Sequence, residues 1–106
     1  MAIENNFIKD ELDNPAGGTS KDIGVDISWQ NGPIAGPDDR NGAFVMDVIQ
    51  IAIDRINFYN ESQFRCRENS LAVTKLEEAI HWLESRRGRR AGEGILGTHK
   101  VDKTEG

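Results

Sequence analysis

Apolar residues recur at helical spacing between residues 43 and 59, a segment without glycine or proline. One row contains Val45, Ile49, Ala52, Ile56 and Tyr59, and a second contains Phe44, Val48, Ile51 and Phe58, interrupted by Arg55. Steps of three and four residues place each row along one side of an α-helix. The two rows together predict a helix that is apolar around most of its circumference. Asn41 is expected to cap its start through the side-chain oxygen.

A second amphipathic helix is expected to begin between Phe64 and Glu68. Its apolar face carries Ala72, Val73, Leu76, Ala79, Ile80 and Leu83. The connection between the two helices, residues 60–63, is short, which is typical of an antiparallel αα-hairpin. Gly88 is expected to weaken the second helix, because glycine costs about 1 kcal/mol in a helix interior.

The first forty residues contain five glycines and all three prolines, which indicates mainly turns. Apolar and polar residues alternate from Ile23 to Trp29, and this alternation predicts one short half-buried strand. The predicted fold class is therefore all-α, an antiparallel two-helix hairpin with an irregular, partly extended N-terminal arm. The predicted divisions are an arm and loop at residues 1–40, a helical-hairpin domain at 41–101 and a disordered tail at 102–106.

The first helix carries more apolar surface than one partner helix can cover. Its spare face must pack against the N-terminal arm, against another subunit, or against both. We favour a homo-oligomer of hairpins, and the alternative is that the arm alone covers the spare face.

Length, composition and net charge exclude several classes of protein. A chain of 106 residues allows one domain. No apolar run approaches the roughly 18 residues that a membrane span needs, and the start of the chain lacks the basic and apolar regions of a signal peptide. The single cysteine, Cys66, excludes an internal disulfide framework. A formal net charge of −5 argues against binding to duplex DNA. We expect a soluble, cytosolic protein.

The sequence offers little for catalysis. His81 and His99 have no cysteine or carboxylate at the spacing of a metal site, and Cys66 has no local partner. The glycines at 92, 94 and 97 have the spacing of a dinucleotide-binding loop. That motif requires a preceding strand, and a predicted helix precedes these glycines. We therefore expect no enzyme activity, no metal and no cofactor.

The strongest local feature is a cluster of arginines at residues 86, 87, 89 and 90, followed by Lys100. Residues 85–100 carry a net charge of +4 in a chain of −5. One or two cations at a helix C-terminus are ordinary, because the helix dipole is negative there. A solvated charge run, a short nucleic-acid patch and a pocket for a compact polyanion all remain open. Arginine suits the last of these, since its planar fork binds phosphate in bidentate fashion.

Longer stretches resemble a known family. They are FRCRENSLAVTKLEEAIHWLESR with the later GILGTHK, and, upstream, ISWQNGP and NGAFVMDVIQIAIDRINFY. Together they are similar to the phage cyclic-nucleotide sponge family, whose helical-hairpin domain is shared by anti-CBASS and anti-Thoeris defence-evasion proteins. The resemblance covers roughly residues 27–101.

The resemblance implies a homo-oligomer, a hexamer in the better-known members, that acts in the host cell cytoplasm. It implies sequestration of cyclic dinucleotides without cleavage, with cyclic trinucleotides and cyclic ADP-ribose isomers as further candidates. Arg86, Arg90 and Asn69 would contact phosphates or sugar edges, Phe58 or Tyr59 would stack on a base, and Thr98 and His99 would close over the ligand. Arg67 and Arg87 would add positive charge. The alternative is a phage adaptor protein whose arginine patch docks on an acidic partner.

Overall fold

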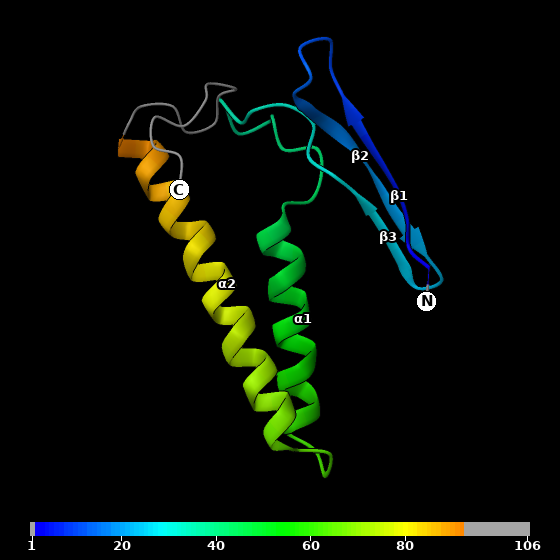
Figure 1. The fold of residues 1–106 in the computed structure, drawn as a ribbon, viewed down its shortest axis with the longest axis vertical. Helices are drawn as coiled ribbons and strands as arrows, with labels where there is room; N and C mark the ends of the chain where they lie inside the picture. The colour runs from blue at the N-terminus through cyan, green and yellow to red at the C-terminus, as the bar shows by residue number, and fades with distance from the viewer. Residues whose placement is uncertain (1, 93–106) are drawn as a thin grey trace. The chain divides into compact units, whose positions relative to one another are not determined.

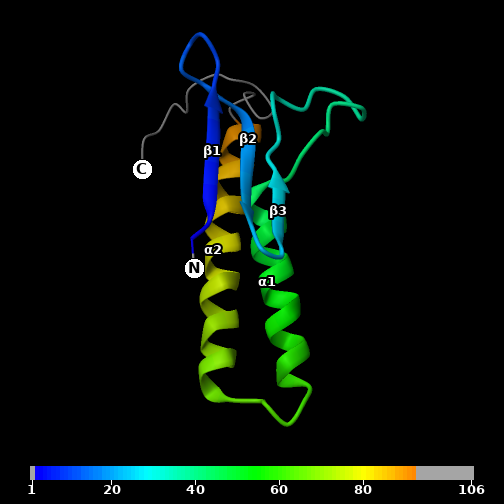
Figure 2. The same cartoon turned by 90° about the vertical axis from the view of Figure 1, so that its right-hand side faces the viewer.

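The computed structural model describes residues 2–92 of the chain. These residues form two compact units, an N-terminal unit of residues 2–44 and a helical unit, Val45–Gly92. The first unit contains a three-stranded sheet and the second contains two long helices (Figures 1 and 2).

The N-terminal unit is an antiparallel sheet. Its strands are β1 (Glu4–Lys9), β2 (Pro15–Asp22) and β3 (Val25–Ser28), in the order β1-β2-β3. The predicted strand between residues 23 and 29 is confirmed as β3. The prediction of an all-α fold is wrong, because two further strands occupy the part of the chain that was expected to be turns.

The sequences of β1 and β2 explain the error. β1 reads ENNFIK and β2 reads PAGGTSKD, so both contain residues that are depleted in strands. Gly18 adopts a φ of +121°, and a side chain there would overlap the carbonyl oxygen of Asn6 on β1. This glycine allows the close approach of two backbones and does not mark a turn.

Two amide side chains hold the loop that follows β3. The Oε1 atom of Gln30 accepts hydrogen bonds from the backbone N–H groups of Asn41 (2.9 Å) and Gly42 (3.1 Å). The Asn41 side chain bonds both backbone groups of Asn31, with Oδ1 accepting at 2.8 Å and Nδ2 donating at 2.9 Å. Asn41 therefore closes this loop, and the prediction that it caps the first helix is wrong.

The helical unit is the predicted hairpin. Helix α1 (Val45–Asn60) and helix α2 (Arg67–Gly92) run antiparallel and pack side by side (Figures 1 and 2). Within residues 45–90 of this unit, the buried apolar side chains are those of Ile53 and Val73. Helix α2 continues through Gly88 to Gly92, so this glycine does not end it.

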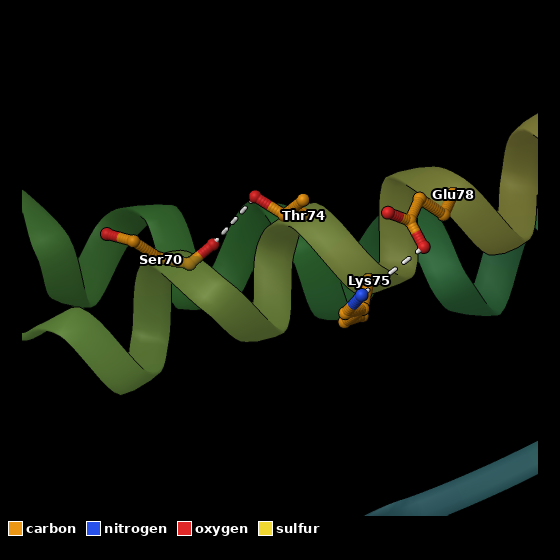
Figure 3. A network of polar contacts seen from close by, with 4 residues as sticks. All are labelled: Ser70, Thr74, Lys75 and Glu78. Atoms are coloured by element: carbon orange, nitrogen blue, oxygen red, sulfur yellow. Dashed lines mark hydrogen bonds and ion pairs between the residues drawn. The ribbon is translucent and has the colours of Figure 1, made fainter.

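Much of the apolar surface of the helices stays exposed. Ile51 on the second apolar row of α1 is 67% exposed, and Trp82 on α2 is 71% exposed. Polar contacts also run along the exposed surface of α2: Thr74 Oγ1 donates to the Ser70 carbonyl at 3.1 Å, and Lys75 Nζ lies 3.6 Å from Glu78 Oε2 (Figure 3). The single chain thus covers one side of each helix and leaves another side with unburied apolar residues.

Candidate ligand-binding site

Four of the expected site residues gather around the connection between the helices. Phe58 and Tyr59 lie in the last turn of α1, and Arg67 and Asn69 lie in the first turn of α2. Phe58 and Tyr59 are 57% and 42% exposed, Arg67 is exposed and Asn69 is half-buried. We call these four residues the turn cluster. It comprises two aromatic residues, a cation and an amide at the end of the hairpin where the helices are connected.

Three further expected residues, Arg86, Arg87 and Arg90, lie in the last turns of α2, which we call the arginine end. Because the helix is continuous across Gly88, Arg86 and Arg90 stand four residues apart on one side of it. Arg86 and Arg87 are exposed, whereas Arg90 is only 6% exposed. Arg90 therefore differs in its surroundings from the two exposed arginines.

The turn cluster and the arginine end are far apart within one chain. Arg86 follows Asn69 by seventeen positions in one continuous helix. At a rise of 1.5 Å per residue, this corresponds to about 25 Å along the axis. The two helices are antiparallel (Figures 1 and 2). Phe58 and Tyr59 lie in the last turn of α1 and Asn69 in the first turn of α2, so all three lie at the same end of the hairpin. A single chain does not bring the two groups of residues together.

Thr98 and His99, which were expected to close over the ligand, lie outside the described residues, as does the predicted tail at 102–106.

Asn60 organises the connection between the helices. Its side chain donates through Nδ2 to Ser70 Oγ (3.3 Å) and accepts at Oδ1 from the Cys66 backbone N–H (3.4 Å). Its carbonyl oxygen accepts from Arg65 Nε at 2.9 Å. A polar pocket of about 530 Å³ opens here, lined by Asn57, Asn60, Glu61, Arg65 and Ser70. One asparagine therefore links α1, the turn and α2, and fixes Arg65 at the pocket.

Arg55 is a further candidate for the site, and it was not among the expected residues. Its guanidinium carbon lies 4.9 Å from the ring centre of Phe58 and 4.9 Å from that of Tyr59. Its Nε–H also donates to Tyr59 Oη at 3.1 Å. The sequence held one signal for this role, since Arg55 is the polar interruption in an otherwise apolar row of α1.

His81 and Cys66 are the other candidates for chemistry within the described residues. His81 is exposed and packs edge-on against Trp82, with ring centres 5.8 Å apart. Cys66 is a free, half-buried thiol at the start of α2. Within residues 2–92, no three histidine, cysteine or acidic side chains gather as metal ligands would. No helix in this range is both long enough and apolar enough to cross a membrane.

Comparison with known proteins gives two matches. The family model described as "Acb2/Tad1, hairpin domain" matches residues 21–87. Thoeris anti-defense 1 of Bacillus phage SBSphiJ7 is 38% identical over 92 residues, which are 79% of this chain and 64% of that protein. The chain thus spans a little under two thirds of the length of this relative. The family match includes the turn cluster, Arg86 and Arg87, and it ends before Arg90.

Proposed function

Since the chain belongs to the Acb2/Tad1 hairpin-domain family, we propose that it is a phage anti-defence protein that sequesters cyclic nucleotide second messengers without cleaving them. Cyclic dinucleotides are the first candidate ligands, and cyclic trinucleotides and cyclic ADP-ribose isomers are the next. Removal of these signals in the host cell cytoplasm would block CBASS or Thoeris immunity. The relative's name, Thoeris anti-defense 1, supports the anti-defence role.

The main observation behind the proposed binding site is the distance between the turn cluster and the arginine end. A cyclic dinucleotide is a compact ring, and its phosphates and bases lie much closer together than the gap of about 25 Å between Asn69 and Arg86. One chain therefore cannot offer both groups to one ligand. The proposed site is composite: the turn cluster of one copy faces the arginine end of another copy in a homo-oligomer.

The exposed apolar side chains of the helical unit support assembly. Ile51 and Phe58 lie on one row of α1, and Leu71 and Trp82 lie on α2, and all four are exposed in the single chain. Large apolar side chains exposed on both helices offer a surface that association can cover. Association of identical subunits would remove this surface from water and repeat the composite site by symmetry. A hexamer is the first candidate for the oligomer.

Each group of the composite site has a distinct task. Arg86 and Arg90 would bind phosphate oxygens through charge-assisted hydrogen bonds. Asn69 would contact a phosphate or a sugar edge, and Phe58 or Tyr59 would stack on a base, a contact worth about 1–3 kcal/mol for single-stranded nucleic acids. Arg67 and Arg87 would raise the local positive potential, and Thr98 and His99 would close the site. No bond changes, so the protein acts in stoichiometric amounts.

Mixed oligomers test the composite site. Asn69→Ala impairs the turn cluster and Arg86→Ala impairs the arginine end, so each variant alone should bind cyclic dinucleotides weakly. In co-expressed mixed oligomers, random pairing would restore roughly a quarter of the sites, because a site needs one intact group from each of two copies. Calorimetric titration would measure the number of restored sites, and native mass spectrometry would verify mixing. Mixed oligomers without restored sites would contradict the composite arrangement.

A thermal-shift panel tests the function itself. A ligand at 100 times its Kd stabilises a protein by about 2.7 kcal/mol. Cyclic di- and trinucleotides and cyclic ADP-ribose isomers would be compared with their linear counterparts, and bound ligand would be recovered intact after denaturation. If no cyclic nucleotide raises the Tm, sequestration is excluded and the adaptor alternative is favoured.

A further inference from the structure

Arg55 contacts two aromatic rings that are neighbours in the sequence. Its guanidinium carbon is equally distant, at 4.9 Å, from the ring centres of Phe58 and Tyr59. The two ring centres are 6.2 Å apart and their planes differ by 56°. The hydrogen bond from Arg55 Nε to Tyr59 Oη adds a directional restraint at 3.1 Å. One cation thus holds both rings.

Helix geometry favours this arrangement. Phe58 and Tyr59 stand three and four residues after Arg55 in α1, and residues at these spacings are neighbours on the surface of a helix. Attraction between the guanidinium and each ring face favours the rotamers that keep both rings against Arg55. Both rings nevertheless remain about half exposed. Arg55 therefore orients them without covering them.

The guanidinium also keeps unused hydrogen-bonding capacity. Arginine has five N–H donors, and Tyr59 Oη accepts from one of them. In the part of the chain that the structure describes, the four donors on the Nη atoms have no acceptor. A phosphate oxygen pair matches two parallel donors of this kind.

We infer that Arg55, Phe58 and Tyr59 form one cationic stacking platform, on which a ligand's base lies against the rings while the phosphate attached to it binds the Arg55 Nη donors. Arg55 is the positioning residue of this platform and also a ligand contact. The inference rests on the proposed function and makes it more specific. In a composite site, the Arg55 platform would take one phosphate of a cyclic dinucleotide and the arginine end the other.

Four substitutions separate the parts of this platform. Arg55→Ala removes the cation, Arg55→Lys keeps the charge but removes the planar fork, and Tyr59→Phe removes only the hydrogen-bond acceptor. Lys75→Ala is the matched control, because it removes an exposed cation elsewhere in the helical unit. Circular dichroism and Tm would verify that each variant folds.

Affinity for cyclic dinucleotides is the first measurement. We expect about a tenfold loss for Arg55→Ala and a smaller, several-fold loss for Arg55→Lys, since a phosphate contact and one orienting attraction are removed or weakened. Lys75→Ala should change affinity less than about twofold. Affinity of Arg55→Ala should also depend less steeply on salt than that of the wild type, because one ionic contact is missing.

The ring signals of Tyr59 are the second measurement, because this residue is the only tyrosine in the chain. In the ligand-free protein, Arg55→Ala should shift the Tyr59 ring resonances and Lys75→Ala should not. In the wild type, added cyclic dinucleotide should shift them again.

The outcomes distinguish this inference from the proposed function. If the wild type binds cyclic dinucleotides and folded Arg55→Ala binds them equally well, the platform is refuted while sequestration stands. If the wild type binds none of the cyclic nucleotides tested, both proposals fail. Unchanged Tyr59 resonances in ligand-free Arg55→Ala would also refute the positioning role.

Discussion

The indole Nε1–H of Trp29 donates to the hydroxyl oxygen of Ser20 at 2.8 Å. The Ser20 hydroxyl in turn donates to Asn5 Oδ1 at 2.7 Å, and Ser20 is buried. Asn5 lies on β1, Ser20 on β2, and Trp29 directly follows β3. One hydroxyl therefore joins all three chain segments of the sheet through side chains, in addition to the backbone ladder.

Ser20→Ala should destabilise the N-terminal unit by about 1–3 kcal/mol, because it leaves a partly buried donor and an acceptor without their partner. Hydrogen exchange of the β2 amides would report this locally, and urea unfolding followed by circular dichroism would report it globally. Ser28→Ala is the control, because Ser28 is exposed on β3. It should change the free energy of unfolding by less than about 0.5 kcal/mol. Equal effects of the two substitutions would contradict the role of the buried hydroxyl.

Gly18→Ala should destabilise the sheet more than Gly24→Ala. Both glycines have positive φ, +121° and +80°, so alanine is strained at each by about 1–3 kcal/mol. A side chain at position 18 would also overlap the Asn6 carbonyl, whereas no atom lies within 4 Å of one at position 24. Free energies of unfolding of the two variants check this order, and a reversed order would refute the close approach of β1 and β2.

Asn60→Ala should loosen the connection between α1 and α2 and cost about 1–2 kcal/mol of stability, because the side-chain hydrogen bonds with Ser70 and with the Cys66 N–H are lost. Asn57→Ala is the matched control, since Asn57 lines the same pocket but is exposed. Hydrogen exchange in the first turn of α2 is the measurement. The prediction fails if exchange there is the same in both variants.

Gly88→Ala should stabilise α2 by about 0.5–1 kcal/mol, because alanine loses less backbone entropy in a helix interior. The added methyl group has no atom within 4 Å to meet. A rise in Tm is the expected readout, and Gly88→Pro should lower it by breaking the helix between Arg86 and Arg90. A lower Tm for the alanine variant would show that Gly88 needs a conformation other than helix.

Ile51→Lys should weaken self-association while preserving the fold of the chain. Ile51 is 67% exposed in the single chain, so lysine disturbs no core contact there, but it would place a charge in an apolar interface. Ile23, at 98% exposure, offers the control Ile23→Lys outside the helices. Sedimentation velocity would compare the two variants with the wild type. An unchanged oligomer in Ile51→Lys would exclude this row from the interface.

The helices were predictable because their signal is local. The rows at three- and four-residue spacing in α1 and α2 report directly which positions share a side of a helix. The aromatic and arginine positions could also be singled out from composition and from the resemblance to the sponge family. Arg55 was missed although it interrupts an apolar row of α1, because its contacts with Phe58 and Tyr59 depend on the side-chain rotamers, which the sequence does not give.

The sequence by itself determined the hairpin and the candidate side chains, since helical periodicity and charge clustering are properties of neighbouring residues. Only the tertiary structure decided that the arm is a sheet, because β1 and β2 owe their pairing to contacts such as Gly18 against Asn6, between residues distant in the chain. It also decided that the turn cluster and the arginine end lie at opposite ends of α2. That separation follows from the continuity of the helix across Gly88, where the cost of one glycine is outweighed by the hydrogen bonds of the helix around it.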